Sequence, residues 1–397
     1  MFMRKDDKDR IEFSLITFSH VLIHVFPASI APLLPLIKTE FNLSYTGVGL
    51  LTFILSLCWA FSGIPAGIAS DKMDRIKLII LMFFLVSIFS AIITLMSTLP
   101  GVLLLLILLF LTIGIFHPPA YSYLSYRYPR KKGKMVGIFE TGGSVGILIA
   151  PIVAGIVGSC YGWRYVYTFW AIPAFIMALL LYLFSSNNRL RDCRVAQAKE
   201  KKINKEQSSQ KRRPSFYHPH FKAIYLTQGF FGFVSGGSIS FLPLFLTDVH
   251  KLSTSTAGGM LTVFLAGGAL GKVIGGRCSD AFGARKIIGI GFLITSFFLL
   301  LIPLVTSFFL VFVLLPAGIV FFMILPALIL LTGEIKTSDL GLAYGIQVLS
   351  GATFGAFSRL LCGTISDLLG IKFIFFLLSV IALFSAIFVY SYLKKTR

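Results

Sequence analysis

The side chains best able to do chemistry in this chain are a few ionisable groups that interrupt long apolar runs. They are His20, His24, His117, Glu140, Lys272 and Arg359. A charged group in the hydrocarbon of a bilayer is costly, so each of them is a candidate for a functional role. No nucleophile stands in a pattern with a base or a metal-ligand set, so we do not expect an enzyme.

Proton transfer is the chemistry that Glu140 favours. This residue lies about 9 Å, at 1.5 Å per residue, inside the apolar run that begins near residue 134. A carboxylate held away from water can take up and release a proton near neutral pH. The alternative is a structural ion pair with Lys131, Lys132 or Lys134.

The histidines are further candidates for carrying protons. His20 and His24 are one helical turn apart and share a helix face, so they form either a titrating pair or a pair of hydrogen bonders. His117 precedes two prolines, whose missing N–H groups leave carbonyls to be satisfied. It is either a hydrogen bonder at a helix break or a substrate ligand. Because no third ligand shares the face of His20 and His24, we expect no metal site and no cofactor.

Lys272, Arg359 and Gln228 are candidates for substrate binding or gating. Lys272 precedes Arg277 by five residues and can extend towards the membrane surface. Arg359 lies about 27 Å along its helix from Gly341 at 1.5 Å per residue. A guanidinium does not readily lose its charge, so Arg359 needs a carboxylate, carbonyls, water or an anionic substrate.

Twelve apolar runs must position these groups. The chain is 56% hydrophobic and 13% charged, far from the composition of a water-soluble protein. Each run can form a spanning helix, which needs roughly 20 residues. The runs are 12–37, 45–69, 76–97, 100–124, 134–158, 163–184, 220–247, 255–276, 287–307, 309–332, 341–364 and 371–393. We therefore predict an all-α integral membrane protein, with a first helix kinked or broken by Pro27, Pro32 and Pro35.

The basic residues predict the orientation of the chain. With both termini in the cytoplasm, most of the 36 Lys and Arg residues fall on the cytoplasmic side, and only four fall outside. Those four are Lys38, Arg164, Lys251 and Lys372. This bias is the positive-inside rule, and it accounts for the net charge of +20 without nucleic acid. We expect a multi-pass protein of the cell membrane. The five cysteines have no metal-like spacing and are expected to be packing residues.

The second half of the chain is a copy of the first. Gly67–Lys77 recurs 209 positions later as Gly276–Lys286, and Pro35 recurs as Pro243 at an offset of 208. A repeat of this length is typical of transporters built from duplicated bundles.

The duplication predicts three parts of the chain. They are an N-terminal six-helix bundle at 1–184, a basic cytoplasmic linker at 185–219 and a C-terminal six-helix bundle at 220–397. The linker is too polar to span a membrane, so we expect it to tether the halves and contact anionic lipid headgroups. A regulatory or partner-binding role is the alternative.

Small residues at four-residue spacing mark the second, fifth, eighth and eleventh helices. They are Gly63/Gly67, Gly142/Gly146/Ala150/Ala154, Gly267/Gly271/Gly275 and Gly351/Gly355. Such residues let helix backbones approach closely. We expect them to form the seam between the two halves.

The duplicated charged loop resembles the signature motif of the major facilitator superfamily. The matching residues are Gly67, Asp71, Arg75 and Lys77 in the first copy and Gly276, Asp280, Arg285 and Lys286 in the second. Asp74 replaces a glycine of the pattern, and Ala281 and Ala284 replace basic residues. The resemblance implies a twelve-helix transporter with a central cavity lined by helices one, four, seven and ten. It also implies that Asp71 and Asp280 form a breakable cytoplasmic latch.

Two further stretches resemble narrower branches of that family. Gly146, Pro151 and Gly155 look like the glycine-proline motif of its proton-coupled antiporters, with Ala150 and Ala154 in place of two glycines. A structural proline kink is the alternative interpretation.

The second stretch is more specific. Ser19-His20, Pro35-Leu36 and Phe116-His117-Pro118 resemble the fosmidomycin-resistance branch, which implies proton-driven efflux of small toxic compounds. That branch would have an acidic residue where this chain has His24.

The function favoured by these observations is proton-coupled export, by antiport and alternating access, of a small organic molecule or drug. Uptake or exchange of a small organic anion is the alternative, favoured by Arg359 and the histidines. A non-transporting receptor or scaffold is a third hypothesis, which the charged motifs in both halves do not favour. The expected partners are a small-molecule substrate, protons and the lipid bilayer, with no nucleic acid, and we expect a monomer.

Overall fold

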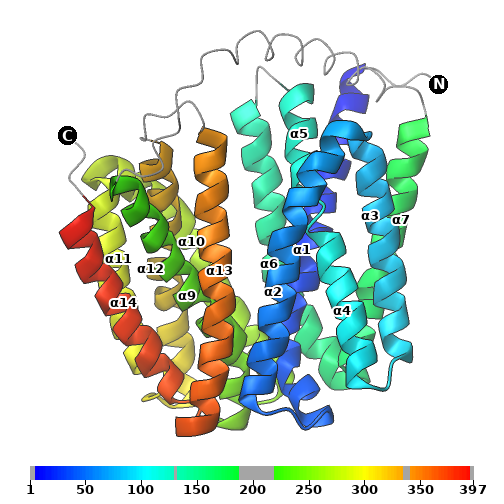
Figure 1. Ribbon diagram of the computed structural model, residues 1–397. Coiled ribbons are helices and arrows are strands. Elements are labelled where there is room, and N and C mark those ends of the chain that lie inside the picture. The colour runs from blue at the N-terminus through cyan, green and yellow to red at the C-terminus, as the bar shows by residue number, and fades with distance from the viewer. Residues whose placement is uncertain (1–4, 129–131, 187–218, 334–339, 394–397) are drawn as a thin grey trace. The chain divides into compact units, whose positions relative to one another are not determined.

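The described residues fold almost entirely into α-helices (Figure 1). The computed structural model describes residues 5–128, 132–186, 219–333 and 340–393, and these ranges contain no strand. Twelve of the helices found there are long and apolar enough to cross a membrane. The predicted fold class is therefore confirmed. Most predicted ends agree to within a few residues, and the eighth span runs further than expected, to Phe282.

The first half of the sequence forms seven α-helices and one 3₁₀ turn. They are α1 (Lys5–Glu40), α2 (Tyr45–Lys72), α3 (Arg75–Ile92), η1 (Ile93–Leu95), α4 (Leu99–Ile113), α5 (His117–Arg127), α6 (Lys132–Tyr161) and α7 (Trp163–Ser186). One predicted span, 100–124, is divided between α4 and α5.

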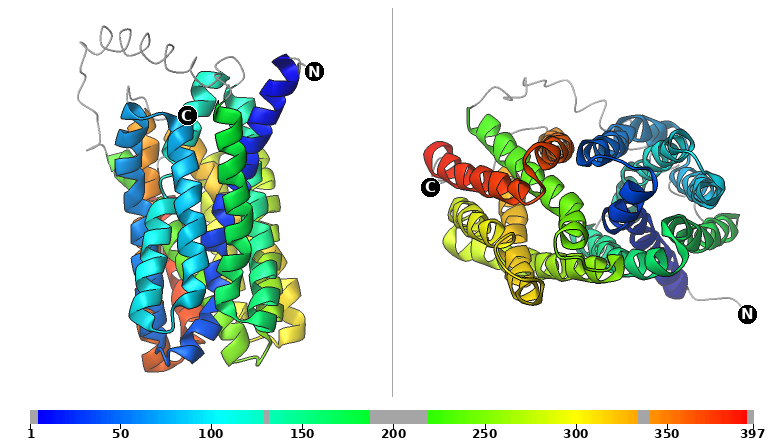
Figure 2. Two further views of the ribbon diagram at one scale, coloured as in Figure 1. Left: turned by 90° about the vertical axis from the view of Figure 1, so that its right-hand side faces the viewer. Right: turned by 90° about the horizontal axis from the view of Figure 1, so that it is seen from below.

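The described part of the second half forms six helices. They are α9 (Pro219–Asp248), α10 (Thr254–Phe282), α11 (Ala284–Leu301), α12 (Ser307–Gly333), α13 (Leu340–Leu369) and α14 (Phe373–Tyr392). Within this half α10 packs on α12, α9 on α13 and α11 on α14, which can be followed in the two views of Figure 2.

Backbone contacts divide the chain into two compact units. Unit 1 comprises Met1–Ser29, Cys58–Ala150 and Tyr161–Lys211, and unit 2 comprises Ile30–Leu57, Pro151–Cys160 and Arg212–Arg397. Unit 2 thus contains the C-terminal part of α1, the N-terminal part of α2 and a short piece of α6. The boundaries predicted at 184 and 220 rest on the duplication and stay a prediction. Most of the predicted linker lies outside the described residues.

Within unit 2 the duplication reappears as two equivalent close contacts. A Cβ on Gly49 would lie 2.5 Å from the carbonyl oxygen of Arg359, so α2 and α13 touch through their backbones. A Cβ on Gly258 would likewise meet the carbonyl of Pro151, where α10 touches α6. Gly258 is the repeat copy of Gly49 at an offset of 209, and Arg359 is the repeat copy of Pro151 at an offset of 208.

Several glycines that were expected at the seam between the two halves lie elsewhere. Gly267, Gly271 and Gly275 of α10 face backbone carbonyls of α12, and Gly351 of α13 faces Gly232 of α9. These close contacts hold helices together inside the C-terminal half, so these glycines do not form the expected seam. The four helices named for the seam nevertheless meet, α2 with α13 at Gly49 and α6 with α10 at Gly258. Spacing alone shows that a helix face is small, and it does not show which neighbour that face meets.

The prolines of α1 do not break it. The helix is continuous from Lys5 to Glu40, so of the two predicted outcomes, a kink or a break, the break does not occur and the kink stays a prediction. Each proline removes one backbone hydrogen bond, and the bonds on either side persist. The break occurs instead between α4 and α5, after Gly114 and before the pair Pro118-Pro119.

Candidate functional site

The break between α4 and α5 positions His117. Gly114 ends α4, and a side chain there would strike Trp59 and Ser62 of α2, so only glycine allows this approach. The prolines after His117 occupy the first turn of α5, where their missing N–H groups cost nothing. His117 is consequently the first residue of α5, and its ring lies beside that of Trp59, with 6.2 Å between the two ring centroids.

Three histidines meet at this point in unit 1. The Nε2 atoms of His20 and His24 are 3.0 Å apart. The ring of His117 lies 5.3 Å from each of the other two rings, centroid to centroid. The spacing of His20 and His24 predicted their shared face. The arrival of His117 from another helix could not be read from spacing.

The environment of His20 fixes its tautomer. Its side chain is 1% exposed, and its Nδ1 lies 2.7 Å from the carbonyl oxygen of Phe139 on α6. Because a carbonyl only accepts hydrogen bonds, Nδ1 carries the proton and Nε2 presents a lone pair towards His24. The imidazole also stacks on the Phe139 ring at 3.9 Å.

Gly143 of α6 supports both α1 histidines. A Cβ there would lie 2.7 Å from Cε1 of His20 and 2.9 Å from Cδ2 of His24. Any larger residue would push the two rings out of place. The next small residue, Gly146, faces the carbonyl of Val21 and thus packs α6 directly on α1.

Tyr121 connects the histidines to Glu140, and the sequence analysis missed it. Its hydroxyl donates a hydrogen bond to Oε1 of Glu140, and its ring lies 5.9 Å from His117. The Glu140 side chain is exposed, so the protein itself does not shield it from its surroundings. The signal that could have found Tyr121 is its position one helical turn after His117.

The three substrate or gating candidates lie in unit 2, each with a different partner. Arg359 donates from Nε to the hydroxyl of Ser240 at 3.0 Å. Gln228 is buried and accepts a hydrogen bond of 3.3 Å from Gln347. Nζ of Lys272 lies 5.8 Å from the centre of the Phe322 ring.

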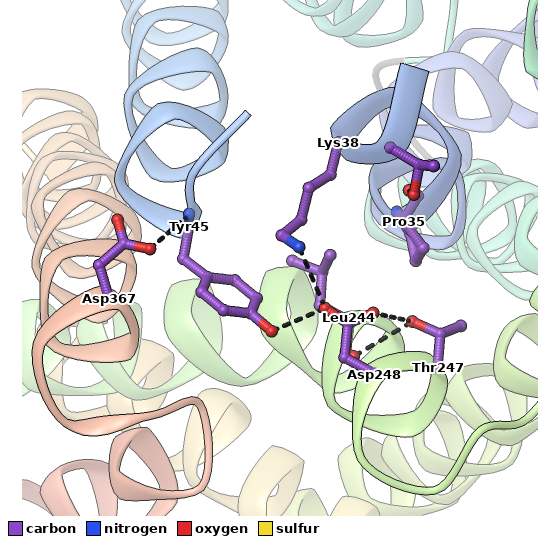
Figure 3. Close-up of polar contacts among 8 residues, drawn as sticks. Pro35, Lys38, Tyr45, Leu244, Thr247, Asp248 and Asp367 are labelled. Carbon is purple, nitrogen blue, oxygen red and sulfur yellow. Dashed lines mark hydrogen bonds and ion pairs between the residues drawn. The ribbon is translucent and has the colours of Figure 1, made fainter. Parts of the chain in front are cut away.

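A polar network that the sequence analysis also missed joins α1, α2 and α9 in unit 2 (Figure 3). Lys38 pairs with Asp248 at 3.4 Å, and the Tyr45 hydroxyl donates to the same carboxylate at 2.7 Å. Nζ of Lys38 also lies 4.5 Å from the centre of the Tyr45 ring. Since these residues sit at helix ends, in sequence they resemble ordinary solvated or capping groups.

Asp367 of α13 extends this network to the start of α2. Its two carboxylate oxygens accept from the backbone N–H groups of Tyr45 and Thr46, at 2.9 and 2.7 Å. The third N–H of the first turn, from Gly47, is satisfied by Ser44. A carboxylate at a helix N-terminus is favourable, because the first N–H groups otherwise lack partners and carry partial positive charge.

The first copy of the charged motif shows why one departure from its pattern is tolerated. Asp74, which replaces glycine, caps α3 by accepting from the N–H groups of Ile76 and Lys77, with φ at −68°. Its repeat copy, Gly283, has φ at +88°. Arg75 is buried, a Cβ on Gly67 would meet open space, and the side chain of Asp71 lies outside the described part.

In the second copy Arg285 bonds to the end of α14. It donates to the carbonyls of Val389 and Tyr390, so it anchors α11 to α14. Asp280 and Lys286 are exposed, and a Cβ on Gly276 would again meet open space.

The antiporter-like motif of α6 is used for close packing. The carbonyl of Pro151 faces Gly258, as described above. Gly155, one turn later, lies against the first residues of α10, with a Cβ there 3.0 Å from Cα of Ser255.

Twelve candidate membrane helices arranged by duplication are the architecture of a secondary transporter. The model of the Major Facilitator Superfamily matches residues 16–258 and 224–397. The chain belongs to the major facilitator superfamily of membrane transporters.

Individual relatives are distant. A fosmidomycin resistance protein of Escherichia coli is 23% identical over 374 residues, which cover 93% of this chain and 90% of that protein. A cis,cis-muconate transport protein of Acinetobacter baylyi is 25% identical over 278 residues, covering 68% of this chain and 66% of that protein. Among solved structures, a bacterial homologue of the human lysosomal transporter Spinster superposes with a TM-score of 0.83 at 20% identity, covering 96% of each chain. This similarity establishes the fold.

Proposed function

We propose that this transporter exports a small organic molecule in exchange for protons. The observation that carries the proposal is the continuous set of titratable groups in unit 1, which runs from the exposed Glu140 through Tyr121 to the three histidines. The similarity to a relative named as a fosmidomycin resistance protein also favours export.

Each group has a part in the proposed proton path. Glu140 is exposed and would be the group at which protons enter the path. The Tyr121 hydroxyl donates a hydrogen bond to the Glu140 carboxylate, and by rotating it would transfer a proton towards His117. His117 and His24 then lead to His20, which is buried and hydrogen bonded to a backbone carbonyl. An imidazole can accept a proton at one nitrogen and release it at the other, so these rings suit a relay.

The test uses purified protein in liposomes that hold a trapped pH dye. A proton gradient is imposed, and phosphonates, antibiotics and carboxylates are added in turn. We expect substrate-dependent proton flux that falls at least about tenfold in Glu140→Gln and in Tyr121→Phe. Tyr182→Phe is the matched control, because Tyr182 is 60% exposed on α7 and outside the cluster. Full proton flux in Glu140→Gln would refute the proposed path.

Uptake or exchange of an organic anion is the second candidate. Arg359 supplies a positive charge beside Ser240, and one relative is named as a transporter of the dicarboxylate cis,cis-muconate. The same liposomes separate the two functions. Carboxylate movement with a silent pH dye, lost in Arg359→Gln, would favour anion exchange over proton antiport.

The remaining features complete the proposal. The bias of Lys and Arg supports a protein of the plasma membrane with both termini in the cytoplasm, and we propose that it acts as a monomer. Asp71 and Asp280 then lie on the cytoplasmic side, where pairing with basic residues would form the breakable latch.

A further inference from the structure

We propose that His20, His24 and His117 bind a divalent transition-metal ion such as Zn²⁺. One ligand nitrogen from each side chain lies within 4.8 Å of the other two. Zinc–nitrogen bonds of about 2.0–2.1 Å in a tetrahedral site put the ligand atoms roughly 3.3 Å apart. The His20 and His24 nitrogens, 3.0 Å apart, are already close to that spacing. The His117 nitrogen, within 4.8 Å of the other two, would have to move inward to complete a three-imidazole site.

The hydrogen bond behind His20 supports this assignment. Metal-bound imidazoles commonly donate their second N–H to a carbonyl or carboxylate, which fixes the ring and the lone pair. His20 has this arrangement, since its Nδ1 faces the Phe139 carbonyl at 2.7 Å and its Nε2 faces inward. The stacking on Phe139 and the contact with Gly143 hold the ring further.

Aromatic side chains surround the three imidazoles. Phe116 stacks on His20 at 5.7 Å between ring centroids, and Trp59 lies beside His117. Three neutral nitrogens are good ligands for Zn²⁺, Cu²⁺ or Ni²⁺ and poor ligands for Mg²⁺ or Ca²⁺. Three protein ligands also leave a fourth position for water or an anion.

The helix break brings the third ligand, which the sequence did not place. His20 and His24 alone are two ligands on one helix face, too few for a site. Because α5 starts at His117, its first side chain reaches the same point from a second element. The bound ion would therefore connect α1 to α5. The inference stands on this geometry and does not depend on proton export.

Metal binding can be measured directly on full-length protein with a purification tag that contains no histidine. Zn²⁺ is titrated calorimetrically into the detergent-solubilised chain. We expect one ion per chain, with affinity at least tenfold weaker in His24→Gln and His117→Gln. His250→Gln is the control and should bind as the wild type does, since His250 lies beyond α9, outside the cluster. Wild-type affinity in His117→Gln, or no binding by the wild type at millimolar Zn²⁺, would overturn the proposal.

Two further variants keep the test independent of folding. His20→Gln should fold, because the repeat copy of position 20 is Gln228, already buried against a glycine. It should lose the ion. His24→Cys should bind Co²⁺ through sulfur and give the thiolate-to-cobalt absorption band that the wild type lacks. Absence of that band in a folded His24→Cys protein with bound Co²⁺ would show that position 24 is not a ligand.

Discussion

Replacement of Asp367 by alanine should loosen the start of α2. The change removes two hydrogen bonds from a carboxylate to backbone N–H groups, at 2.9 and 2.7 Å. Loss of a helix cap costs about 0.5–2 kcal/mol, and bonds to charged groups reach about 1.5–3 kcal/mol. Because the carboxylate is exposed, solvent screening reduces its contribution. We therefore expect a loss of about 1–2 kcal/mol, a factor of about 5–30 in the equilibrium.

Thermal unfolding in detergent, followed by circular dichroism at a fixed scan rate, measures this loss. The apparent Tm of Asp367→Ala should fall by about 1.2–2.4 °C, because the unfolding entropy of a chain of 397 residues is about 0.8 kcal/mol/K. Asp367→Asn should fall by less, because an asparagine side chain also accepts from helix N–H groups. Ser159→Ala is the matched control, since Ser159 is the exposed repeat copy of Asp367. A Tm of Asp367→Ala within 1 °C of the wild type, or equal losses in Asn and Ala, would refute the capping role.

Three further predictions concern packing, pH and the charged motif. Gly258→Ala should lower the stability of the protein by about 1–3 kcal/mol, because the added Cβ meets the Pro151 carbonyl. Gly259→Ala is the control and should be neutral, because a Cβ there meets open space. Equal Tm values for the two variants would contradict the close contact. Burial and the nearby Lys372 lower the pKa of His250 below its usual value of about 6.5. The unfolded chain then takes up this proton first, so stability is lost as pH falls below about 6.5, and His250→Gln should lessen the drop in Tm between about pH 7 and pH 5. Asp71→Asn should impair transport with normal membrane insertion, and full activity would exclude the latch.

The fold could be predicted because its signals are local. An apolar run of spanning length and the placement of Lys and Arg each depend on neighbours in sequence. The positions at which helices break depend less on neighbours in sequence. The three prolines of α1 predicted a kinked or broken helix, and the helix is continuous, whereas the pair after His117 marks the observed break. What decides between these outcomes is the packing around the proline, which sequence does not give.

The candidate site was only partly predictable, because its groups meet across helices. His20 and His24 share a face of one helix, so their spacing sufficed. Tyr121 carries no charge and costs little in a membrane, so its position one turn after His117 was the one sign of it in the sequence, and its bond to Glu140 needed the structure. Asp248 likewise resembled an ordinary helix-end residue until Lys38 and Tyr45 were found on it.

The duplication shows how one pair of equivalent buried positions carries a titratable group in only one of its two copies. In unit 1 the buried His20 lies against Gly143, and in unit 2 the buried Gln228 lies against Gly351, 2.7 Å from its Cβ position. Both members of the second pair are copies of the first at an offset of 208. One ancestral contact, a polar side chain on a glycine, therefore became an imidazole in one copy and an amide in the other. An amide does not titrate, so at this pair of positions only the N-terminal copy can exchange a proton or donate an imidazole lone pair to a metal ion.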